Sequence, residues 1–538
     1  MRRQLRFGAA ALWLGAAACN GFLGIDEGTP RPAIGAGGSA GEDGSGGASG
    51  SGGLGGSGAP KICEPGTEAS CYYGPKGTEG IGTCKAGTRT CNGSGTAYTG
   101  ACLNQVVPWI DMCGDEDCDG VLDPQSAGCT ALWFRRISSS GDGTLAVDGT
   151  GHVNLAGTLK HSLDCGGVTL VSQGQGDAFS CVLDADDAGH RWSRRMGAAG
   201  TDAANAVAVD SLGNWLLTGG FIGEIQLGAQ PQSHQQSAGA HDIFIVKYDP
   251  NGNDLWAKRF GDGDDEWGGS IAIDGAGNVF VTGVCNGTIN FGDAFKLCDY
   301  RGIFVVKLAP SGEYVWSKVF KATAQSSAFD IAADSSGNVV LTGELQGSIN
   351  FGGGMLTSAG NTDIFVVKLN ALGEHVWSQL FGDATSQSGE SVAVDSVGNV
   401  LVTGGFDGYT NFGSGPLVSA GSHDVFVAKL SSSGLHVWSR SFGADDYDWG
   451  RDVAVDATGN VLLTGRFQGA VDFGGGPLQS AGGTDIYVAK LTAAGDTVWS
   501  RSFGTASSDH AHSIASDGDG NVVIAGEAAG LFVAKLSK

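Results

Sequence analysis

Short apolar runs alternate with turn residues from residue 131 to the end of the chain. A marker of the form Asp-x-x-Gly-Asn recurs every 60 to 64 residues, with His152 replacing Asn in the first copy, beginning at Asp148, Asp210, Asp274, Asp334, Asp395, Asp456 and Asp517. An alternating run such as 392–394 precedes each marker, and a run such as 461–465 follows it. Because Asp, Gly and Asn accept the backbone of tight turns, each marker predicts a β-hairpin of two strands, A and B.

Two more strands complete each repeat. After a longer Gly-rich connection comes strand C. It ends in Lys in six repeats, at 243–247, 303–307, 364–368, 425–429, 486–490 and 531–535. The first repeat has a weaker version around Phe179 and Cys181. Strand D follows and centres on a tryptophan in six repeats: Trp192, Trp256, Trp316, Trp377, Trp438 and Trp499. Four strands per repeat is the size of a propeller blade.

The two ends of this region complement each other. The last repeat stops at Lys538 after strand C, whereas residues 131–137 have the pattern of a strand D with no strand C before it. Docking 131–137 beside 531–536, with Trp133 near Phe532, would complete a seventh blade and leave no unpaired seam. An open solenoid would need no such match. We therefore predict an all-β fold, a seven-bladed β-propeller over residues 131–538 with 3+1 closure by an N-terminal strand.

Two segments of the repeat point to a known family. The Ala-Val-Asp-x-x-Gly-Asn hairpin and the Phe-Val-Ala-Lys-Leu strand, seen at 393–399 and 426–430, resemble the SBBP β-propeller repeat. The resemblance extends over residues 131–538 and implies a bacterial surface or secreted protein, often one without an assigned activity. The sequence departs from the pattern in its degenerate first repeat and in a short B-to-C connection at 527–530.

Residues 1–18 have the pattern of a signal peptide, with three arginines before an apolar run that is too short to span a bilayer. The small residues 16–18 before Cys19 resemble the lipobox of bacterial lipoproteins, which implies acylation of Cys19. Cleavage by an ordinary signal peptidase is the alternative, because the family usually has Leu at the place of Ala16. Thirteen cysteines less Cys19 leave twelve, an even number that suits disulfides in an oxidising compartment. We expect an exported protein at the cell surface or outer membrane, which contacts the membrane through its lipid alone.

Two segments separate Cys19 from the propeller. Residues 19–60 are rich in Gly and Ser and are expected to form a flexible tether, and 61–130 hold eight cysteines, which predicts a small disulfide-rich module of open connectivity. Within this module, five positions resemble an EF-hand or thrombospondin type-3 calcium loop: Asp115, Asp117, Asp119, Val121 and Asp123. Ser126 replaces the usual Glu, so an acidic turn held between Cys113 and Cys118 is the alternative. Calcium is the only cofactor that we expect, and none is required.

Most repeated polar residues are expected to be structural. The marker Asp should hold its own turn, strand-D Trp should pack between blades, and strand-C Lys should be solvated or snorkelling. His241 and His423 stand where sister repeats have Thr and are interpreted as loop variation. The segment 509–512 could bind a transition metal through His510 and His512, but the sequence places no third ligand. Two cysteine pairs, each within one blade, predict disulfides: Cys165 with Cys181 and Cys285 with Cys298.

The D-to-A connections break the repeat, and rigid scaffolds commonly display function in such loops. They form the predicted ligand face with Asp264, Asp265, Trp267, Asp446, Tyr447, Asp448 and Trp449. A net charge of −25 argues against nucleic-acid binding. We expect a monomeric, non-enzymatic binding or adhesion scaffold for a protein or carbohydrate. The alternatives are an extracellular hydrolase or lyase with its active site on the propeller axis, and a purely structural envelope protein.

Overall fold

The computed structural model describes residues 68–71, 87–91, 98–103, 131–137, 142–528 and 530–538. The chain divides into two compact units, Met1–Val107 and Pro108–Lys538. The first unit contains an antiparallel sheet of order β1-β2-β3, formed by β1 (Glu68–Cys71), β2 (Gly87–Cys91) and β3 (Tyr98–Leu103). No helix among the described residues is long and apolar enough to cross a bilayer.

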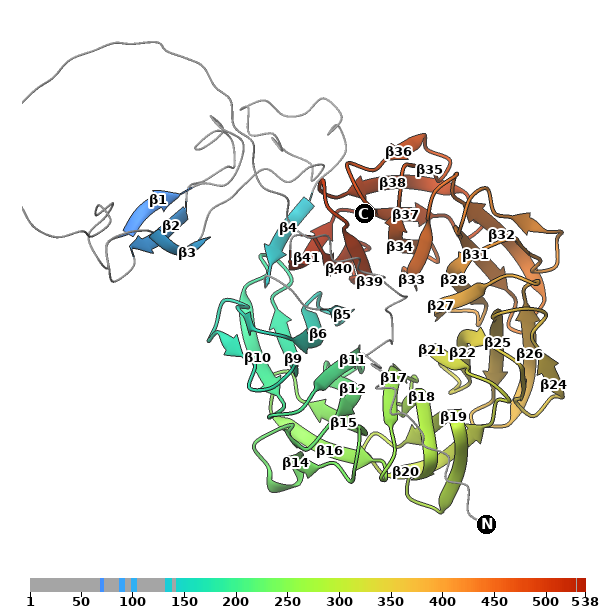
Figure 1. Cartoon of the computed structure of the whole chain (residues 1–538), viewed down its shortest axis with the longest axis horizontal. Helices are drawn as coiled ribbons and strands as arrows, with labels where there is room; N and C mark the ends of the chain where they lie inside the picture. Colours follow the sequence, from blue (N-terminus) through green and yellow to red (C-terminus); the bar gives the residue numbers. More distant parts are fainter. Residues whose placement is uncertain (1–67, 72–86, 92–97, 104–130, 138–141, 529) are drawn as a thin grey trace, which may run out of the picture. The chain divides into compact units, whose positions relative to one another are not determined.

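The second unit is a ring of seven four-stranded antiparallel sheets (Figure 1). Blade 1 consists of β5 (Gly143–Val147), β6 (Val153–Leu159), β9 (Asp177–Leu183) and β10 (His190–Met196). Blade 2 consists of β11 (Asp202–Val209), β12 (Trp215–Phe221), β15 (Asp242–Tyr248) and β16 (Asp254–Phe260). Blade 3 consists of β17 (Glu266–Ile273), β18 (Val279–Asn290), β19 (Phe295–Leu308) and β20 (Tyr314–Phe320). Blade 4 consists of β21 (Ser327–Ala333), β22 (Val339–Leu345), β25 (Asp363–Leu369) and β26 (His375–Phe381).

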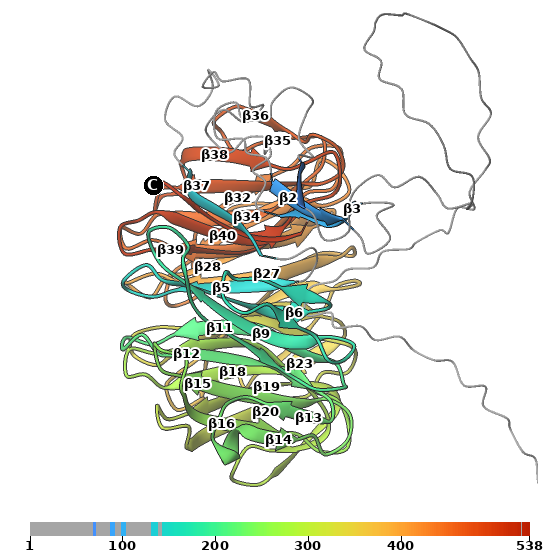
Figure 2. The same cartoon turned by 90° about the vertical axis from the view of Figure 1, so that its left-hand side faces the viewer.

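The remaining blades repeat this order. Blade 5 consists of β27 (Gln387–Val394), β28 (Val400–Phe406), β31 (Asp424–Leu430) and β32 (His436–Phe442). Blade 6 consists of β33 (Trp449–Val455), β34 (Val461–Phe467), β37 (Asp485–Leu491) and β38 (Thr497–Phe503). Blade 7 consists of β39 (His510–Ser516), β40 (Val522–Glu527), β41 (Leu531–Leu536) and β4 (Ala131–Arg136). The innermost strands of successive blades contact one another around the whole ring, and the strands run across its thickness in the side view of Figure 2.

The B-to-C connections carry short two-stranded hairpins in five blades. They are β7 (Ser162–Leu163) with β8 (Leu170–Val171), β13 (Glu224–Gln226) with β14 (His234–Gln236), β23 (Ser348–Asn350) with β24 (Met355–Thr357), β29 (Tyr409–Thr410) with β30 (Leu417–Val418), and β35 (Ala470–Asp472) with β36 (Pro477–Gln479). The 3-10 turn η1 (Pro231–Ser233) precedes β14. In blade 3 the strands β18 and β19 extend into one long hairpin instead. The predicted disulfides Cys165–Cys181 and Cys285–Cys298 are both present at these connections.

Ring closure occurs as the sequence predicted, but the ring that stacks on Phe532, with centroids 5.7 Å apart, is Phe134 and not Trp133 as expected. Strand β4 pairs antiparallel with β41, with Trp133 opposite Lys535 and Arg136 opposite Phe532. The Trp133 indole N–H donates to the Ala185 carbonyl of blade 1 at 3.0 Å. Five of the strand-D tryptophans make the same bond to the C-to-D turn of the next blade, so the prediction that they link blades is confirmed.

The marker Asp shapes its turn in every blade. In blade 5 the Oδ1 atom of Asp395 accepts the backbone N–H groups of Val397 and Asn399, and Oδ2 accepts the Asn399 side-chain amide at 2.8 Å. Gly398 has φ +86°, a left-handed conformation that favours glycine. These bonds lower the pKa of Asp395 against the opposing effect of burial.

The prediction that the strand-C lysines are solvated or snorkelling is wrong, because their whole side chains are buried. All six are buried and pair with the marker Asp of their own blade, for example Lys247 with Asp210 at 2.8 Å and Lys429 with Asp395 at 3.0 Å. The Lys429 ammonium also donates to the Ala493 carbonyl in the next blade. A buried ammonium is stable only when paired, and the turn supplies the carboxylate.

Candidate functional site

Six innermost strands, in blades 2 to 7, contain a β-bulge that leaves one residue outside the ladder. The bulged residues are Asn205, Gly269, Phe329, Glu390, Arg451 and His512. A bulge re-aims a side chain that would otherwise pack in the sheet. In blades 5 to 7 the re-aimed groups are charged or titratable, and they come from consecutive blades.

The residues after these bulges form a hydrogen-bonded arc of alternating Ser and Asp. Asp330 accepts the hydroxyls of Ser270 and Ser391 at 2.7 and 3.0 Å, and Asp452 accepts those of Ser391 and Ser513 at 2.7 and 3.1 Å. Burial raises the pKa of Asp452 to about 6, and the nearby Asp330 adds to the rise. The arc links blades 3 to 7 through hydrogen bonds between neighbouring innermost strands.

An ion pair bridges blades 5 and 6 at the bulge positions. Arg451 donates to Glu390 at 2.9 Å, and both side chains are largely buried, at 14% and 8% exposure. Burial raises the pKa of Glu390 to about 7, with Glu344 adding to the rise, while hydrogen bonds from Ser388 and Trp449 oppose it. Burial lowers the pKa of Arg451 to about 9.

Two histidines of blade 7 continue this cluster. Burial lowers the pKa of His512 to about 3 and that of His510 to about 4, and the positive charges of Arg451 and Arg466 lower both further. Both imidazoles are therefore neutral at physiological pH. The Nε2 atom of His512 is shielded from solvent and has no hydrogen-bond partner among the described residues.

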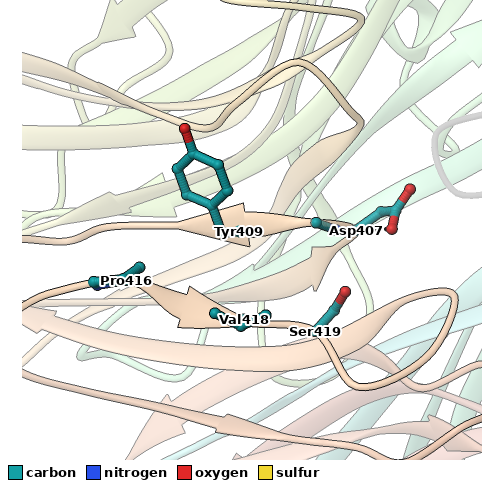
Figure 3. A pocket seen from close by; sticks show the side chains of 6 residues that line it. Asp407, Tyr409, Pro416, Val418 and Ser419 are labelled. Atoms are coloured by element: carbon teal, nitrogen blue, oxygen red, sulfur yellow. Dashed lines mark hydrogen bonds between the residues drawn. The ribbon is translucent and has the colours of Figure 1, made fainter.

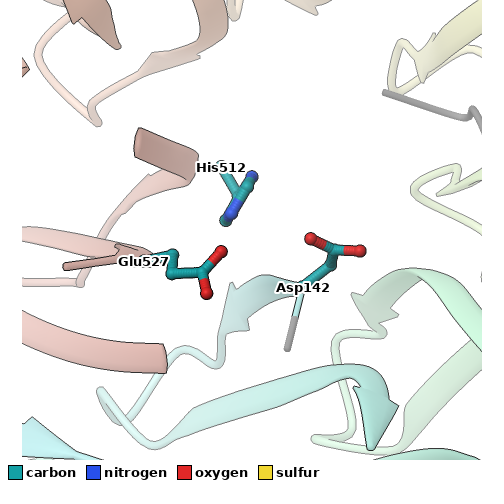
Figure 4. A group of neighbouring side chains, drawn as sticks. All are labelled: Asp142, His512 and Glu527. Atoms are coloured by element: carbon teal, nitrogen blue, oxygen red, sulfur yellow. The ribbon is translucent and has the colours of Figure 1, made fainter. Parts of the chain in front are cut away.

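Two carboxylates lie beside His512. Asp142, just before β5, and Glu527, at the end of β40, flank its ring in Figure 4, and one donor atom of each of the three residues lies within 4.8 Å of the others. Burial raises the pKa of Glu527, and the nearby Asp142 adds to the rise. We call the whole group the axial cluster: Glu390, Arg451, Arg466, His510, His512, Glu527 and Asp142.

An aromatic ledge adjoins the axial cluster between blades 5 and 6. The rings of Tyr447 and Trp449 stack in parallel with centroids 5.6 Å apart, and His423 lies 5.2 Å from Trp449. Arg466 lies 5.1 Å over the Tyr447 ring and donates to its hydroxyl at 3.1 Å. Because the Trp449 side chain also acts on the Glu390 carboxylate and opposes the rise in its pKa, the ledge adjoins the axial ion pair.

A second aromatic pair occupies the same position between blades 2 and 3. His241 lies 4.0 Å from Trp267 and pairs with Asp265 at 2.9 Å. The neighbouring bulge positions hold Asn205 and Gly269, so no charged bulge residue adjoins this pair. The interpretation of His241 and His423 as loop variation missed their packing on these tryptophans.

The predicted ligand face is only partly exposed. Asp264 and Asp446 are exposed, while Trp267, Tyr447 and Trp449 are half-buried, as is Asp265. Asp448 is fully buried, so its expected place on the surface is corrected. Its carboxylate accepts the backbone N–H groups of Ala444 and Gln468 and thus holds the connection together. Burial raises its pKa to about 7.

Two hollows lie away from the axial cluster. One, of about 470 Å³, is on the hairpin of blade 5 and is lined by Asp407, Gly408, Tyr409, Pro416, Val418 and Ser419 (Figure 3). The other, of about 390 Å³, lies between the A-to-B turns of blades 1 and 2, where Val182 takes the place of the strand-C lysine and His152 that of the turn Asn.

Two predicted sites lie outside the described residues. These are the lipidation site at Cys19 and the calcium loop at Asp115, Asp117, Asp119, Val121 and Asp123. Both remain predictions.

The fold and the site define a seven-bladed β-propeller protein with charged groups gathered at its axis. Residues 255–290 and 376–412 match the beta-propeller repeat family SBBP, which confirms the repeat type.

More distant similarities accompany this match. The chain is 23% identical to an uncharacterized WD repeat-containing protein of Acanthamoeba polyphaga mimivirus, over 67% of this chain and 32% of that protein, so it spans about a third of the relative's length. A quinohemoprotein alcohol dehydrogenase from Comamonas testosteroni is similar in structure, with a TM-score of 0.40 and 11% identity over 76% of each chain. BamB from Moraxella catarrhalis has a TM-score of 0.35 and 11% identity over 77% of this chain and 98% of its own.

Proposed function

We propose that the propeller is a saccharide-binding scaffold of an exported protein, and that the ligand lies over the aromatic ledge and the axial cluster. The observation that carries this proposal is that the stacked rings of Tyr447 and Trp449 adjoin the ion pair of Glu390 and Arg451. A sugar ring presents an apolar C–H face, which suits an aromatic ring. It also presents hydroxyl groups, which suit charged donors and acceptors.

Charge balance supports a neutral or zwitterionic ligand. Arg451 pairs with Glu390, and the charge of Arg466 acts on the same carboxylate, while Asp142 and Glu527 add negative charge beside His512, so the cluster holds groups of both signs. Binding sites typically combine an apolar wall with a few convergent polar groups, and this region has both.

The test compares two tryptophans at the same position of the repeat. We expect Trp449→Ala to weaken binding to the saccharide selected on a glycan array by about tenfold or more, because it removes the ledge beside the ion pair. Trp267→Ala is the matched control and should change the Kd by less than about threefold, since no charged bulge residue adjoins it. Titration calorimetry measures both.

The proposal fails if both variants bind like the wild type, or if Tyr409→Ala abolishes binding instead. The latter result would place the ligand in the hollow of blade 5.

A hydrolase or lyase is the second candidate. The arrangement of His512 between Asp142 and Glu527 favours it, because a non-repeated imidazole beside carboxylates near the propeller axis is what general acid–base chemistry requires. Release of new chain ends from the array ligand by the wild type, but not by His512→Ala, would support this candidate over simple binding.

We also propose export and anchoring through Cys19. The two disulfides of the propeller support an oxidising compartment. Fatty-acid labelling of the full chain, absent in Cys19→Ser, is the expected result, and equal labelling of both would contradict it.

A further inference from the structure

We propose that Asp142, His512 and Glu527 bind one borderline divalent cation such as Zn²⁺ at the seam between blades 7 and 1. The three residues belong to the axial cluster, so the cation would bind within the region proposed for the saccharide, but the inference concerns a different ligand and does not depend on saccharide binding. His512 is the bulge residue of β39, Glu527 ends β40 and Asp142 precedes β5, so the donors come from two blades that the ring closure at β4 and β41 brings together.

The donor set has the chemistry of a transition-metal site. One imidazole nitrogen and two carboxylate oxygens favour a borderline cation, whereas Ca²⁺ and Mg²⁺ prefer oxygen ligands alone. Zinc sites commonly have three protein ligands and an open fourth position.

The spacing suits such a cation after small side-chain rotations. Zn–N and Zn–O bonds of about 2.0–2.2 Å require donors no more than about 4.4 Å apart. The three donor atoms already lie within 4.8 Å of one another. The bulge at His512 aims its ring between the two carboxylates, as Figure 4 shows.

A second observation points independently to a ligand. The Nε2 atom of His512 is shielded from solvent and has no hydrogen-bond partner among the described residues. A buried polar atom without a partner is costly, and a bound cation would satisfy it. Arg451, whose charge acts on His512, is paired with Glu390. The positive charge of Lys160 lowers the pKa of Glu527 and so favours the carboxylate form that would bind the cation.

The test uses the full chain, stripped of metal by a chelator and titrated with Zn²⁺ in excess Ca²⁺, which saturates any oxygen-only site. We expect the wild type to bind one more Zn²⁺ than His512→Ala. We also expect Glu527→Gln to weaken that site by about tenfold or more. Titration calorimetry counts the ions, and the d–d absorption of Co²⁺ reports the donor geometry.

The matched control is His510→Ala, two residues away on the same strand and outside the triad. We expect His510→Ala to bind the same number of Zn²⁺ ions as the wild type and to give the same Co²⁺ absorption spectrum. Unchanged Zn²⁺ binding in both His512→Ala and Glu527→Gln would overturn the proposal, and so would equal loss in His510→Ala. Glu527→Gln is nearly isosteric, so it gives an answer even if His512→Ala does not fold. No saccharide is present, so this result is independent of the Trp449 test.

Discussion

Buried acids in equivalent positions show how single residues set local stability. Glu266, at the start of β17, is fully buried, and burial raises its pKa to about 8. Its Oε2 atom accepts the Asp262 N–H at 3.0 Å. Blade 5 has Gln387 at the same position, where the amide accepts the Asp383 N–H at 3.1 Å and donates to the Asp383 carboxylate at 2.7 Å. A neutral amide therefore fits this site.

We predict that Glu266→Gln stabilises the protein at pH 8 and has little effect near pH 4. The native state keeps the Glu266 proton, which the unfolded chain releases above its ordinary pKa of 4.5. The wild type therefore loses stability relative to the variant as pH rises from 4.5 to 8. The gain at pH 8 should be on the order of 1 to 3 kcal/mol, measured by thermal unfolding. An equal effect of Glu266→Gln at both pH values would contradict the assignment.

At the scale of elements, the hairpins and blades followed from the sequence, but the environment of the lysines did not. Turn chemistry is local, so Asp-x-x-Gly-Asn predicted each A-to-B hairpin. Burial of Lys depends on a partner in another strand. One signal was nevertheless present: the first repeat lacks the Lys at Val182 and also the Asn at His152.

The axial cluster was harder to predict. Its members lie between positions 142 and 527, and only ring geometry and the bulges bring them together. The segment 509–512 was recognised as a potential metal ligand, yet Asp142 and Glu527 could not be placed beside it without the fold. The sequence does contain a signal for the ledge. Among the blades, only 2 and 5 have the sequence Thr-Gly-Gly-Phe in strand B, and these same blades hold His241 and His423, each followed by a Trp at the start of the next blade. A side chain at Gly220 or Gly405 would collide with Trp267 or Trp449.

The buried ion pair between the strand-C lysine and the marker Asp leads to a prediction: removing the Asp should destabilise the protein more than removing the Lys. Asp395→Ala should destabilise by about 3–5 kcal/mol, because it leaves the buried Lys429 ammonium without a carboxylate. Lys429→Met should cost less, about 1–2 kcal/mol, since Asp395 keeps its bonds from Val397 and Asn399. Blade 1 already has an apolar residue, Val182, in place of this lysine, which shows that the blade can form without it.

Urea unfolding of both variants measures the difference. The exposed and loosely paired Asp496→Ala is the control and should change stability by less than about 0.5 kcal/mol. Equal costs for Asp395→Ala and Lys429→Met would show that the ammonium is not held by this carboxylate.

At the scale of the whole molecule, β4 decides whether the ring closes. A chain that begins at residue 138 lacks β4 and leaves β41 as an open edge. We predict that it melts at a lower temperature than a chain beginning at residue 108, which keeps β4, and that it associates through the exposed edge. Calorimetry and size-exclusion chromatography test this. Equal melting temperatures with both chains monomeric would show that six complete blades suffice.

The direction of β4 has a mechanical consequence. Ala131 pairs with Leu536, beside the A-to-B turns, and Arg136 pairs with Phe532, nearer the opposite face, where Glu527 lies. If a lipid at Cys19 holds one end and a ligand at the axis holds the other, the pulling force enters at Ala131 and runs along the strand. The bonds between β4 and β41 lie across that direction, so they are loaded in shear and share the load instead of unzipping one at a time.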